Sequence, residues 1–197
     1  MLKVGITGNI GSGKTTVSKL FELMGIPVFY ADDAAKNIMV TDGVLISDIK
    51  QAFGAASYFE DGALNRKHIA AIVFNDEAQL AKLNALTHPA VFRAFDNWVA
   101  QIKDAPYVVK EAALLFESTS YKMCDRSIMV TAPLDMRIKR VMQRDSISKE
   151  EVMKRNDRQF TEEKKIALAD YVIKNDETEL IIPQVLKLHE GFLRAAR

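Results

Sequence analysis

The stretch Gly8-Asn9-Ile10-Gly11-Ser12-Gly13-Lys14-Thr15 decides the fold of this chain, because it fits the pattern Gly-x4-Gly-Lys-Ser/Thr. Before it, residues 2–7 form a short apolar run rich in β-branched side chains, which predicts a buried strand. After it, residues 16–24 carry apolar side chains at helical spacing. The pattern therefore falls between a strand and a helix, the setting in which it indicates a phosphate-binding loop.

The residue types of this loop suit that chemistry. The glycines Gly8, Gly11 and Gly13 allow backbone conformations that other residues resist. Successive N–H groups can then point inward around a polyphosphate, at the positive end of the following helix. Lys14 supplies a positive charge for the β- and γ-phosphates of ATP, and Thr15 offers a hydroxyl to Mg²⁺. The alternative, a glycine-rich turn with an exposed lysine, is disfavoured by the flanking strand and helix.

The composition is that of an ordinary globular protein of 197 residues, with 48% hydrophobic and 27% charged residues. The formal net charge of +1 argues against a general nucleic-acid binder, which usually carries a strong basic excess. Cys124 is the one cysteine, which excludes an internal disulfide and fits a reducing compartment. No signal segment or apolar stretch of the ~20 residues needed to span a bilayer is evident. We expect a cytoplasmic protein without membrane or nucleic-acid partners, monomeric or weakly homo-oligomeric.

Five short apolar runs alternate with helical stretches along the chain. They lie at residues 2–7, 28–30, 107–109, 126–131 and 171–173. Strands separated by helices imply a parallel sheet covered on both faces, so we predict an α/β fold, a three-layer α/β/α P-loop NTPase with a five-stranded parallel sheet. Ligands of such sheets bind beyond the carboxyl ends of the strands, where the loop at 8–15 would meet the loops after the second, third and fourth strands.

Residues 43–103 contain several helical patterns and no clear strand, with an expected helix break at His88-Pro89. They predict a helical insert between the second and third strands, which could hold a second substrate beside the phosphates. The expected division of the chain is a nucleotide core of residues 1–42, 104–140 and 166–197, an acceptor domain of residues 43–103, and a lid of residues 141–165.

Two acidic residues, Asp32 and Asp33, follow the second predicted strand. A carboxylate at that edge would lie near the γ-phosphate, where it could orient an attacking hydroxyl or accept its proton. The alternative role is a helix N-cap, which Asp33 suits well. We therefore expect Asp32 to be the functional acid.

Three further polar residues follow predicted strands. Glu111 ends the third strand, where nucleotide-binding sheets often place an acid near Mg²⁺, and Glu117 lies further along. Either could instead be a cap or a surface charge. Asn175, just past the fifth strand, could hydrogen-bond the edge of an adenine, or could be a turn residue before Asp176.

Arg137, Arg140 and Arg144 form one stripe of a predicted helix over residues 134–145. The apolar stripe of this helix should pack on the sheet, so we expect the arginines to face away from it. The following segment, 145–163, is charged, turn-rich and poor in large apolar residues. It could close over a nucleotide as a lid, bringing guanidinium groups to the transferring phosphoryl group. The alternative is a plain surface hairpin with solvated arginines.

The order and spacing of several motifs resemble those of the dephospho-coenzyme A kinases over nearly the whole chain. The matching positions are Gly5–Thr15, Ala31-Asp32 with Ala35, Asp61–Arg66, His88-Pro89, Leu114–Glu117, Arg140 with Gln143–Asp145, Arg158-Gln159, and Ala169–Ile173 with Asn175. Most of these motifs are weak singly, and together they are specific. The resemblance implies a P-loop kinase with a nucleotide core, a helical domain that receives the coenzyme A precursor, and a lid.

The resemblance also implies an activity, the ATP- and Mg²⁺-dependent phosphorylation of the ribose 3′-hydroxyl of dephospho-coenzyme A, which is the last step of coenzyme A biosynthesis. Asp32 matches the family's catalytic carboxylate, and residues 11–16, which include Ser12 and Thr16, match its ATP-binding loop. Arg140 and Arg144 match its lid-side phosphate and adenine contacts. The acceptor contacts that the resemblance implies are Arg66, His88, Leu115 and Glu117. For His88, a helix cap at a kink is the alternative.

Two other functions are compatible with the residues of the loop. A P-loop kinase could phosphorylate a nucleoside monophosphate or another small molecule, because the nucleotide core does not specify the acceptor. A nucleotide-operated switch would usually read guanine with Asn-Lys-x-Asp, and no asparagine of this chain is followed by lysine.

Overall fold

Five parallel strands form one sheet in the computed structural model, which describes residues 1–74 and 76–196. The strands are β1 (Leu2–Thr7), β2 (Val28–Tyr30), β3 (Tyr107–Glu111), β4 (Arg126–Thr131) and β5 (Tyr171–Lys174). They lie in the order β2-β3-β1-β4-β5, and every neighbouring pair is parallel. The predicted sheet is confirmed, with β3 and β5 slightly longer than their apolar runs.

The chain divides into two compact units. One contains residues 1–30 and the chain from residue 102 onward, and therefore the whole sheet; the other contains residues 31–101. The helices of the first unit are α1 (Lys14–Leu23), α6 (Leu134–Asp145), α7 (Lys149–Asn156), α8 (Glu162–Leu168) and α9 (Ile181–Ala195), with a 3-10 turn at Ser120–Met123. The helices of the second are α2 (Ala31–Thr41), α3 (Gly43–Phe53), α4 (Arg66–Val73) and α5 (Glu77–Gln101), with a 3-10 turn at Ala55–Ser57.

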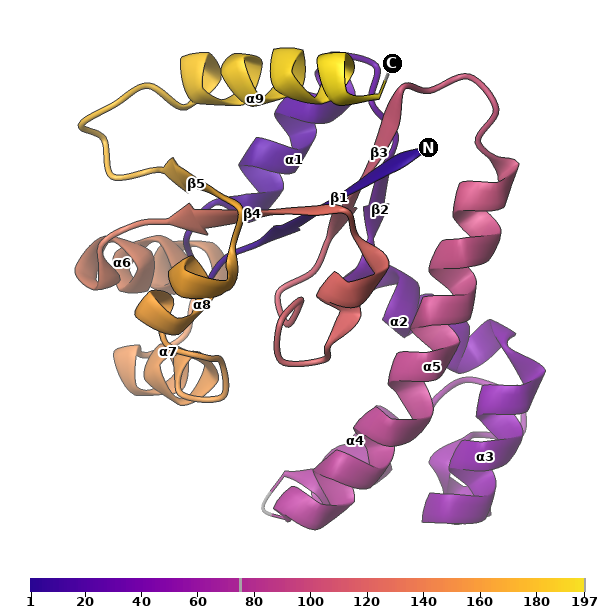
Figure 1. Cartoon of the computed structure of the whole chain (residues 1–197). Helices are drawn as coiled ribbons and strands as arrows, with labels where there is room; N and C mark the ends of the chain where they lie inside the picture. Colours follow the sequence, from indigo (N-terminus) through magenta and orange to yellow (C-terminus); the bar gives the residue numbers. More distant parts are fainter. Residues whose placement is uncertain (75, 197) are drawn as a thin grey trace. The chain divides into compact units, whose positions relative to one another are not determined.

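Helices α1 and α9 lie together on one face of the sheet (Figure 1). The core between them and the strands consists of Val4, Ile6, Val17, Phe21, Ile26, Tyr107, Val109, Ile128, Val130, Ile173, Val185 and Phe192. On the opposite face, a Cβ added to Gly5 would come within 2.8 Å of Leu115 and 3.2 Å of the Cys124 sulfur. The segment after β3 therefore covers this face together with α8, which contacts β4. Side chains thus cover both faces of the sheet, as the α/β prediction requires.

Helix α1 begins directly at the glycine-rich loop. Its first residue, Lys14, follows Gly13, which has a left-handed backbone with φ of 92°. The helix ends where Gly25, with φ of 79°, donates its N–H to the carbonyl of Glu22 at 2.9 Å. The loop is thereby held between the end of β1 and the positive end of α1, as the sequence predicted.

The second unit is helical, as the pattern of residues 43–103 indicated, but it spans residues 31–101 and therefore includes α2, which the expected division assigned to the core. Asp42 caps α3 by accepting hydrogen bonds from the N–H groups of Val44 and Leu45, both at 3.0 Å, and it pairs with Arg93 at 3.2 Å. The apolar core of this unit includes Ile38, Leu45, Ile49, Phe53, Ile69, Leu83, Val91 and Phe95. Within residues 31–74 and 76–101, the sheet-like pairing is one isolated bridge, Tyr58–Leu64.

The expected break at His88-Pro89 is wrong, because α5 continues through Pro89 from Glu77 to Gln101. Proline removes one hydrogen bond from a helix, yet buried side chains on both sides of Pro89 hold the two halves in line. These side chains are Leu83, Thr87, Ala90, Val91 and Phe95. Along the described chain, no helix combines the length and the apolar character that a bilayer crossing requires.

The segment after α6 is more ordered than its charge and turn content predicted. Ser148 forms a capping box with Glu151 and starts α7. Val152 is buried against Ile138 and Val141 of α6 in a small separate core. The expectation that the segment 145–163 is turn-rich is therefore wrong for residues 149–156, which form a helix. The N-terminal cap and the burial of Val152 stabilise this helix although it has few apolar residues.

Candidate functional site

The backbone of the loop can be built only with glycine at two positions. Gly11 and Gly13 have φ of 81° and 92°, a region that strains other residues. A Cβ on Gly11 would collide with the carbonyl of Arg137, and a Cβ on Gly13 would collide with the amide nitrogen of Asn175. At Gly8 a Cβ would meet the Ser12 hydroxyl and the carbonyl of Val130. Tight surroundings therefore impose the shape of the loop.

Side chains distant in sequence hold the loop in place. The Asn9 side chain donates to the carbonyl of Phe160 at 2.9 Å, and the Ile10 N–H donates to Oε1 of Gln159 at 2.8 Å. From the other side, Nδ2 of Asn175 donates to the carbonyl of Ser12 at 2.8 Å. Contacts within the protein thus hold the loop in one shape, and a loop held in one shape loses less conformational entropy on binding.

The loop opens onto a cavity of about 290 Å³. Its lining contains the loop, the start of α1 and the outer side of α6, namely Asn9, Gly11, Ser12, Gly13, Lys14, Thr15, Thr16, Arg140, Val141 and Arg144. Most of the predicted nucleotide contacts are therefore brought together. The hydroxyl of Ser12 and Oδ1 of Asn9 are buried and find no hydrogen-bond partner within the described chain. Three cationic side chains and unsatisfied polar atoms at the positive end of α1 fit a polyphosphate.

Lys14 reaches toward the end of β3. Its ammonium lies 3.4 Å from the carboxylate of Glu111, and Glu111 is almost fully buried. Tyr30, the last residue of β2, pairs with Glu111 across the sheet. Glu111 therefore lies at the carboxyl edge of the sheet, as predicted, and its contact there is with the loop lysine.

Arg140 and Arg144 differ in their present partners. Arg140 donates to the carbonyl of Asn175 at 3.2 Å and pairs with exposed Glu177 at 3.4 Å. Arg144 forms a two-pronged pair with Asp145, at 2.7 and 3.1 Å. These hydrogen bonds raise the pKa of Arg144 and lower the pKa of Asp145. Both guanidinium groups border the cavity, and exposed ion pairs such as these are weak enough to exchange for phosphate oxygens.

Arg137 does not face outward with the other two arginines, which corrects the expected stripe. Its guanidinium is buried and donates to the carbonyl of Ala132 at 2.9 Å and to Oδ1 of Asn156 at 2.8 Å. Burial lowers the pKa of Arg137. The spacing i, i+3, i+7 covers a wide arc of the helix, and this arc includes the side that packs on α7.

A buried lysine that the sequence analysis missed holds together segments next to the phosphate loop. Lys165 of α8 is 0% exposed, and its ammonium donates to the carboxylate of Glu117 and to the carbonyl of Ala113, both at 2.9 Å. The same Glu117 oxygen accepts the N–H of Phe160 at 2.8 Å. Burial lowers the pKa of Lys165. Lys165 follows Lys164 in a charged run, so no local signal distinguished it.

The remaining predicted residues have varied surroundings. Leu115 is fully buried, whereas Arg66 is the exposed first residue of α4. His88 lies half-buried within α5, stacked on Phe92 with ring centroids 6.4 Å apart, and burial lowers its pKa. Asp32 occupies the first turn of α2.

The suggested N-cap role of Asp33 is wrong, because α2 already begins at Ala31. The Asp33 carboxylate pairs instead with Lys36 at 2.7 Å.

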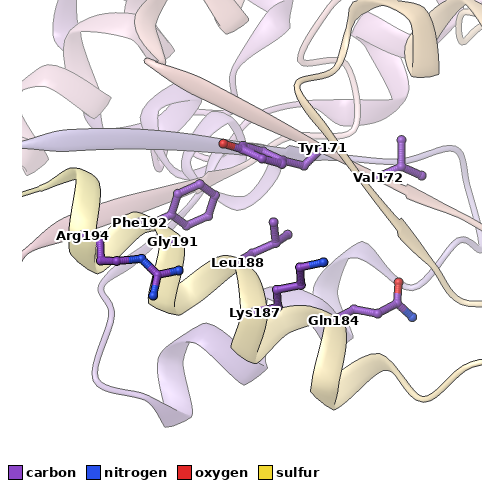
Figure 2. Close-up of a pocket in the computed structure, with 8 residues that line it drawn as sticks. All are labelled: Tyr171, Val172, Gln184, Lys187, Leu188, Gly191, Phe192 and Arg194. Atoms are coloured by element: carbon purple, nitrogen blue, oxygen red, sulfur yellow. The ribbon is translucent and has the colours of Figure 1, made fainter.

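A larger groove of about 510 Å³ lies elsewhere, between β5 and α9 (Figure 2). It runs from Gln184 to Arg194 along α9 and opens beside Tyr171, the first residue of β5. That is the amino end of the strand, whereas ligands of parallel sheets bind at the carboxyl ends. Within the described chain no cluster of three His, Cys, Asp or Glu side chains could hold a metal ion.

The family model and the curated relatives point to the same family. The family model described as dephospho-CoA kinase matches residues 2–180. The dephospho-CoA kinase of Bacteroides fragilis is 36% identical over 187 residues, covering 95% of this chain and 91% of the relative. A crystal structure of a Thermus thermophilus protein matches with a TM-score of 0.84 and 34% identity, covering 96% of each chain. The dephospho-CoA kinase from Campylobacter jejuni matches with a TM-score of 0.72 and 25% identity, covering 99% of this chain and 98% of its own.

Proposed function

This chain belongs to the dephospho-CoA kinase family, and we propose in detail how its residues carry out the family's reaction. The reaction transfers the γ-phosphoryl group of ATP to the ribose 3′-hydroxyl of dephospho-coenzyme A and completes coenzyme A biosynthesis. The observation that carries the proposal is the shape of the loop, where a side chain at Gly8, Gly11 or Gly13 would collide with its surroundings and whose cavity gathers Lys14, Arg140 and Arg144.

The loop would hold the triphosphate of ATP. Its backbone amides and Lys14 would bind the β- and γ-phosphates, and the Thr15 hydroxyl would bind Mg²⁺. When bound, Mg²⁺ neutralises charge on the phosphate oxygens. Thr15 is exposed beside the cavity, and a Cβ added to Gly8, Gly11 or Gly13 would collide with its surroundings. Both observations support this assignment.

Arg140 and Arg144 would stabilise the transferring group. Negative charge spreads over the phosphoryl oxygens during transfer, and guanidinium groups placed there lower its energy. Residues 141–165 would act as the lid that brings Arg144 into place. The exposed pairs of Arg140 with Glu177 and of Arg144 with Asp145 support this role, because little free energy opposes their exchange.

Asp32 would be the catalytic carboxylate. The ribose 3′-oxygen attacks the γ-phosphorus, the bond from that phosphorus to the β–γ bridging oxygen breaks, and ADP leaves. The hydroxyl proton passes to the Asp32 carboxylate. The support comes from chain connectivity: Asp32 follows Tyr30 by two residues, and Tyr30 pairs with Glu111, which contacts Lys14.

The acceptor would be received by residues 43–103, with Arg66 and His88 among its contacts. Exposed Arg66 suits an anionic phosphate of the acceptor, and the lowered pKa of His88 favours a neutral ring. Glu117 and Leu115 are less well supported, since Lys165 and Phe160 already occupy one Glu117 oxygen and the Leu115 side chain is fully buried. The cytoplasmic location and the monomeric or weakly oligomeric state stay predictions.

The catalytic assignment is tested with Asp32→Asn. Loss of a general base should lower kcat by roughly 10²-fold or more at saturating substrates. The matched control is Asp33→Asn, which removes an exposed carboxylate paired with Lys36 and should leave kcat nearly unchanged. If kcat of Asp32→Asn stayed within about threefold of the wild type, the assignment would be wrong.

The acceptor is tested separately by coupled measurement of ADP release. We expect turnover with dephospho-coenzyme A and little with nucleoside monophosphates or simple alcohols. Faster turnover with a nucleoside monophosphate would favour the alternative of a different small-molecule kinase on the same core.

A further inference from the structure

Asn175 is anchored by its backbone before its side chain makes any contact. Its N–H donates to the carbonyl of Thr131, the last residue of β4, at 2.8 Å. Because β4 and β5 are paired up to Thr131 and Lys174, this bond extends the sheet ladder by one step. The Asn175 side chain therefore projects from a rigid position.

From that position the carboxamide contacts the phosphate loop. Its Nδ2 donates to the carbonyl of Ser12 at 2.8 Å, and it lies so close to Gly13 that a Cβ there would collide with it. A trans peptide is planar, so the Ser12 carbonyl and the Gly13 N–H point in opposite directions. Holding the carbonyl toward Asn175 turns the Gly13 N–H away from Asn175.

Asn175 lines a different hollow from the cavity onto which the loop opens. It is absent from the lining of the 290 Å³ cavity, which includes Ser12 and Gly13, and it lines a neighbouring hollow of about 500 Å³ with Thr16 and Leu20. The Gly13 N–H is therefore directed toward the cavity side of the loop, where a phosphate oxygen would be bound.

A second bond links Asn175 to an arginine of the site. The carbonyl of Asn175 accepts a hydrogen bond from Arg140 at 3.2 Å, and Arg140 lines the cavity. One residue anchored to β4 thus contacts both the loop and a cationic side chain that lines the cavity.

We propose that Asn175 is a positioning residue for phosphate binding, which orients the Ser12–Gly13 peptide and Arg140 and does not read the adenine base. The proposal rests on the proposed ATP-dependent function and adds a role to the same site. The Ser12 carbonyl uses one of the two Nδ2 protons of Asn175, so the choice between loop positioning and a base contact is made by the experiment below.

The two roles predict different responses to removal of the base. A residue that reads adenine affects binding of ATP and has no effect on binding of tripolyphosphate, which has no base. A residue that positions the loop weakens both ligands by the same factor. Calorimetry with the magnesium complexes of ATP and tripolyphosphate, in the absence of any acceptor, separates the two cases.

For Asn175→Ala we expect the Kd of both ligands to rise by a similar factor of about ten or more, as for loss of a buried hydrogen bond. Asn175→Asp has nearly the same shape, cannot donate from its ionised carboxylate to the Ser12 carbonyl, and brings negative charge near the phosphates. Its Kd values should rise further. The control is Asp176→Ala in the same turn, whose carboxylate accepts hydrogen bonds from the N–H and hydroxyl of Thr178. Its Kd values should stay within about twofold.

A rise in the Kd of ATP alone would overturn the proposal and assign Asn175 to the base. Unchanged Kd values for both ligands in the folded Asn175→Asp variant would overturn it as well. Because neither ligand requires dephospho-coenzyme A, these outcomes are independent of the acceptor. Failure of the wild-type protein to bind either ligand would instead refute the proposed function, and this inference with it.

Discussion

Lys164 and Lys165 are adjacent in sequence but have very different surroundings. Lys165 is fully buried between the Glu117 carboxylate and the Ala113 carbonyl. The Lys164 ammonium instead lies over the ring of Phe160, 3.3 Å from its centroid. Removing one partner of a buried pair leaves the other charge without compensation. We therefore expect Lys165 to contribute more to the free energy of unfolding than Lys164 does.

We expect Lys165→Met to lower the free energy of unfolding by about 3 kcal/mol, because the Glu117 carboxylate would stay buried without its cation. The matched control, Lys164→Met, loses a cation–π contact and should cost about 1 kcal/mol or less. Urea denaturation of the two variants measures the difference. Equal costs would show that the buried pair adds nothing to stability.

Burial raises the pKa of the Cys124 thiol to about 11, from an ordinary value of 9.0. The thiolate is the reactive form, so at pH 8 its population falls by about a hundredfold relative to a thiol of ordinary pKa. Iodoacetamide should accordingly modify the native protein about a hundredfold more slowly than the urea-unfolded chain. Similar rates in both states, measured by intact mass, would contradict the partly buried position of the Cys124 sulfur beside Gly5 of β1.

Helix α5 shows how packing overrides a local breaking signal. Pro89 lies in its interior, although proline in a helix interior costs about 3 kcal/mol. The helix persists because buried residues before and after Pro89 pack against the other helices of residues 31–101. The free energy of this packing offsets the backbone penalty of Pro89. Replacing that one residue would remove the penalty.

Pro89→Ala should therefore raise the free energy of unfolding, by about 1 to 3 kcal/mol, since the new N–H restores a helical hydrogen bond. Pro106→Ala is the control, because Pro106 precedes β3 outside any helix. Its replacement should instead lower stability by about 0.4 to 1 kcal/mol through a freer unfolded chain. Thermal or urea unfolding of both variants gives the signs, and a loss of stability in Pro89→Ala would mean that α5 depends on the proline.

Elements with a strong local pattern were the most predictable. The strands at residues 2–7, 28–30 and 126–131 lie where their apolar runs indicated, because a strand buried on both faces has few polar positions to confuse the pattern. The helical character of residues 43–103 was likewise evident from periodicity. Pro89 and the charged segment around α7 misled the prediction, because α5 and α7 depend on a few buried contacts with other helices.

For the whole molecule, the rise in Tm on ligand binding should measure how tightly the phosphate loop binds its ligand. A ligand that binds the native state stabilises it by about 2.7 kcal/mol at a hundred times its Kd. Mg²⁺ with ATP should therefore raise the Tm of the wild-type protein, and Lys14→Ala should abolish most of that shift. The control is Lys19→Ala, which removes an exposed lysine of α1. Equal shifts in the Lys14→Ala and wild-type proteins, measured by scanning calorimetry, would exclude Lys14 from phosphate binding.

Local pattern was sufficient to identify the phosphate loop, the order of the strands along the chain and the family. Glycine spacing, apolar runs and motif order are properties of consecutive residues, and each constrains the backbone near itself. The tertiary structure was required to show that Arg137 is buried against Asn156, that Lys165 pairs with Glu117, and that Asn175 contacts the Ser12 carbonyl. These partners lie far apart in sequence, and long-range packing alone brings them within hydrogen-bond distance.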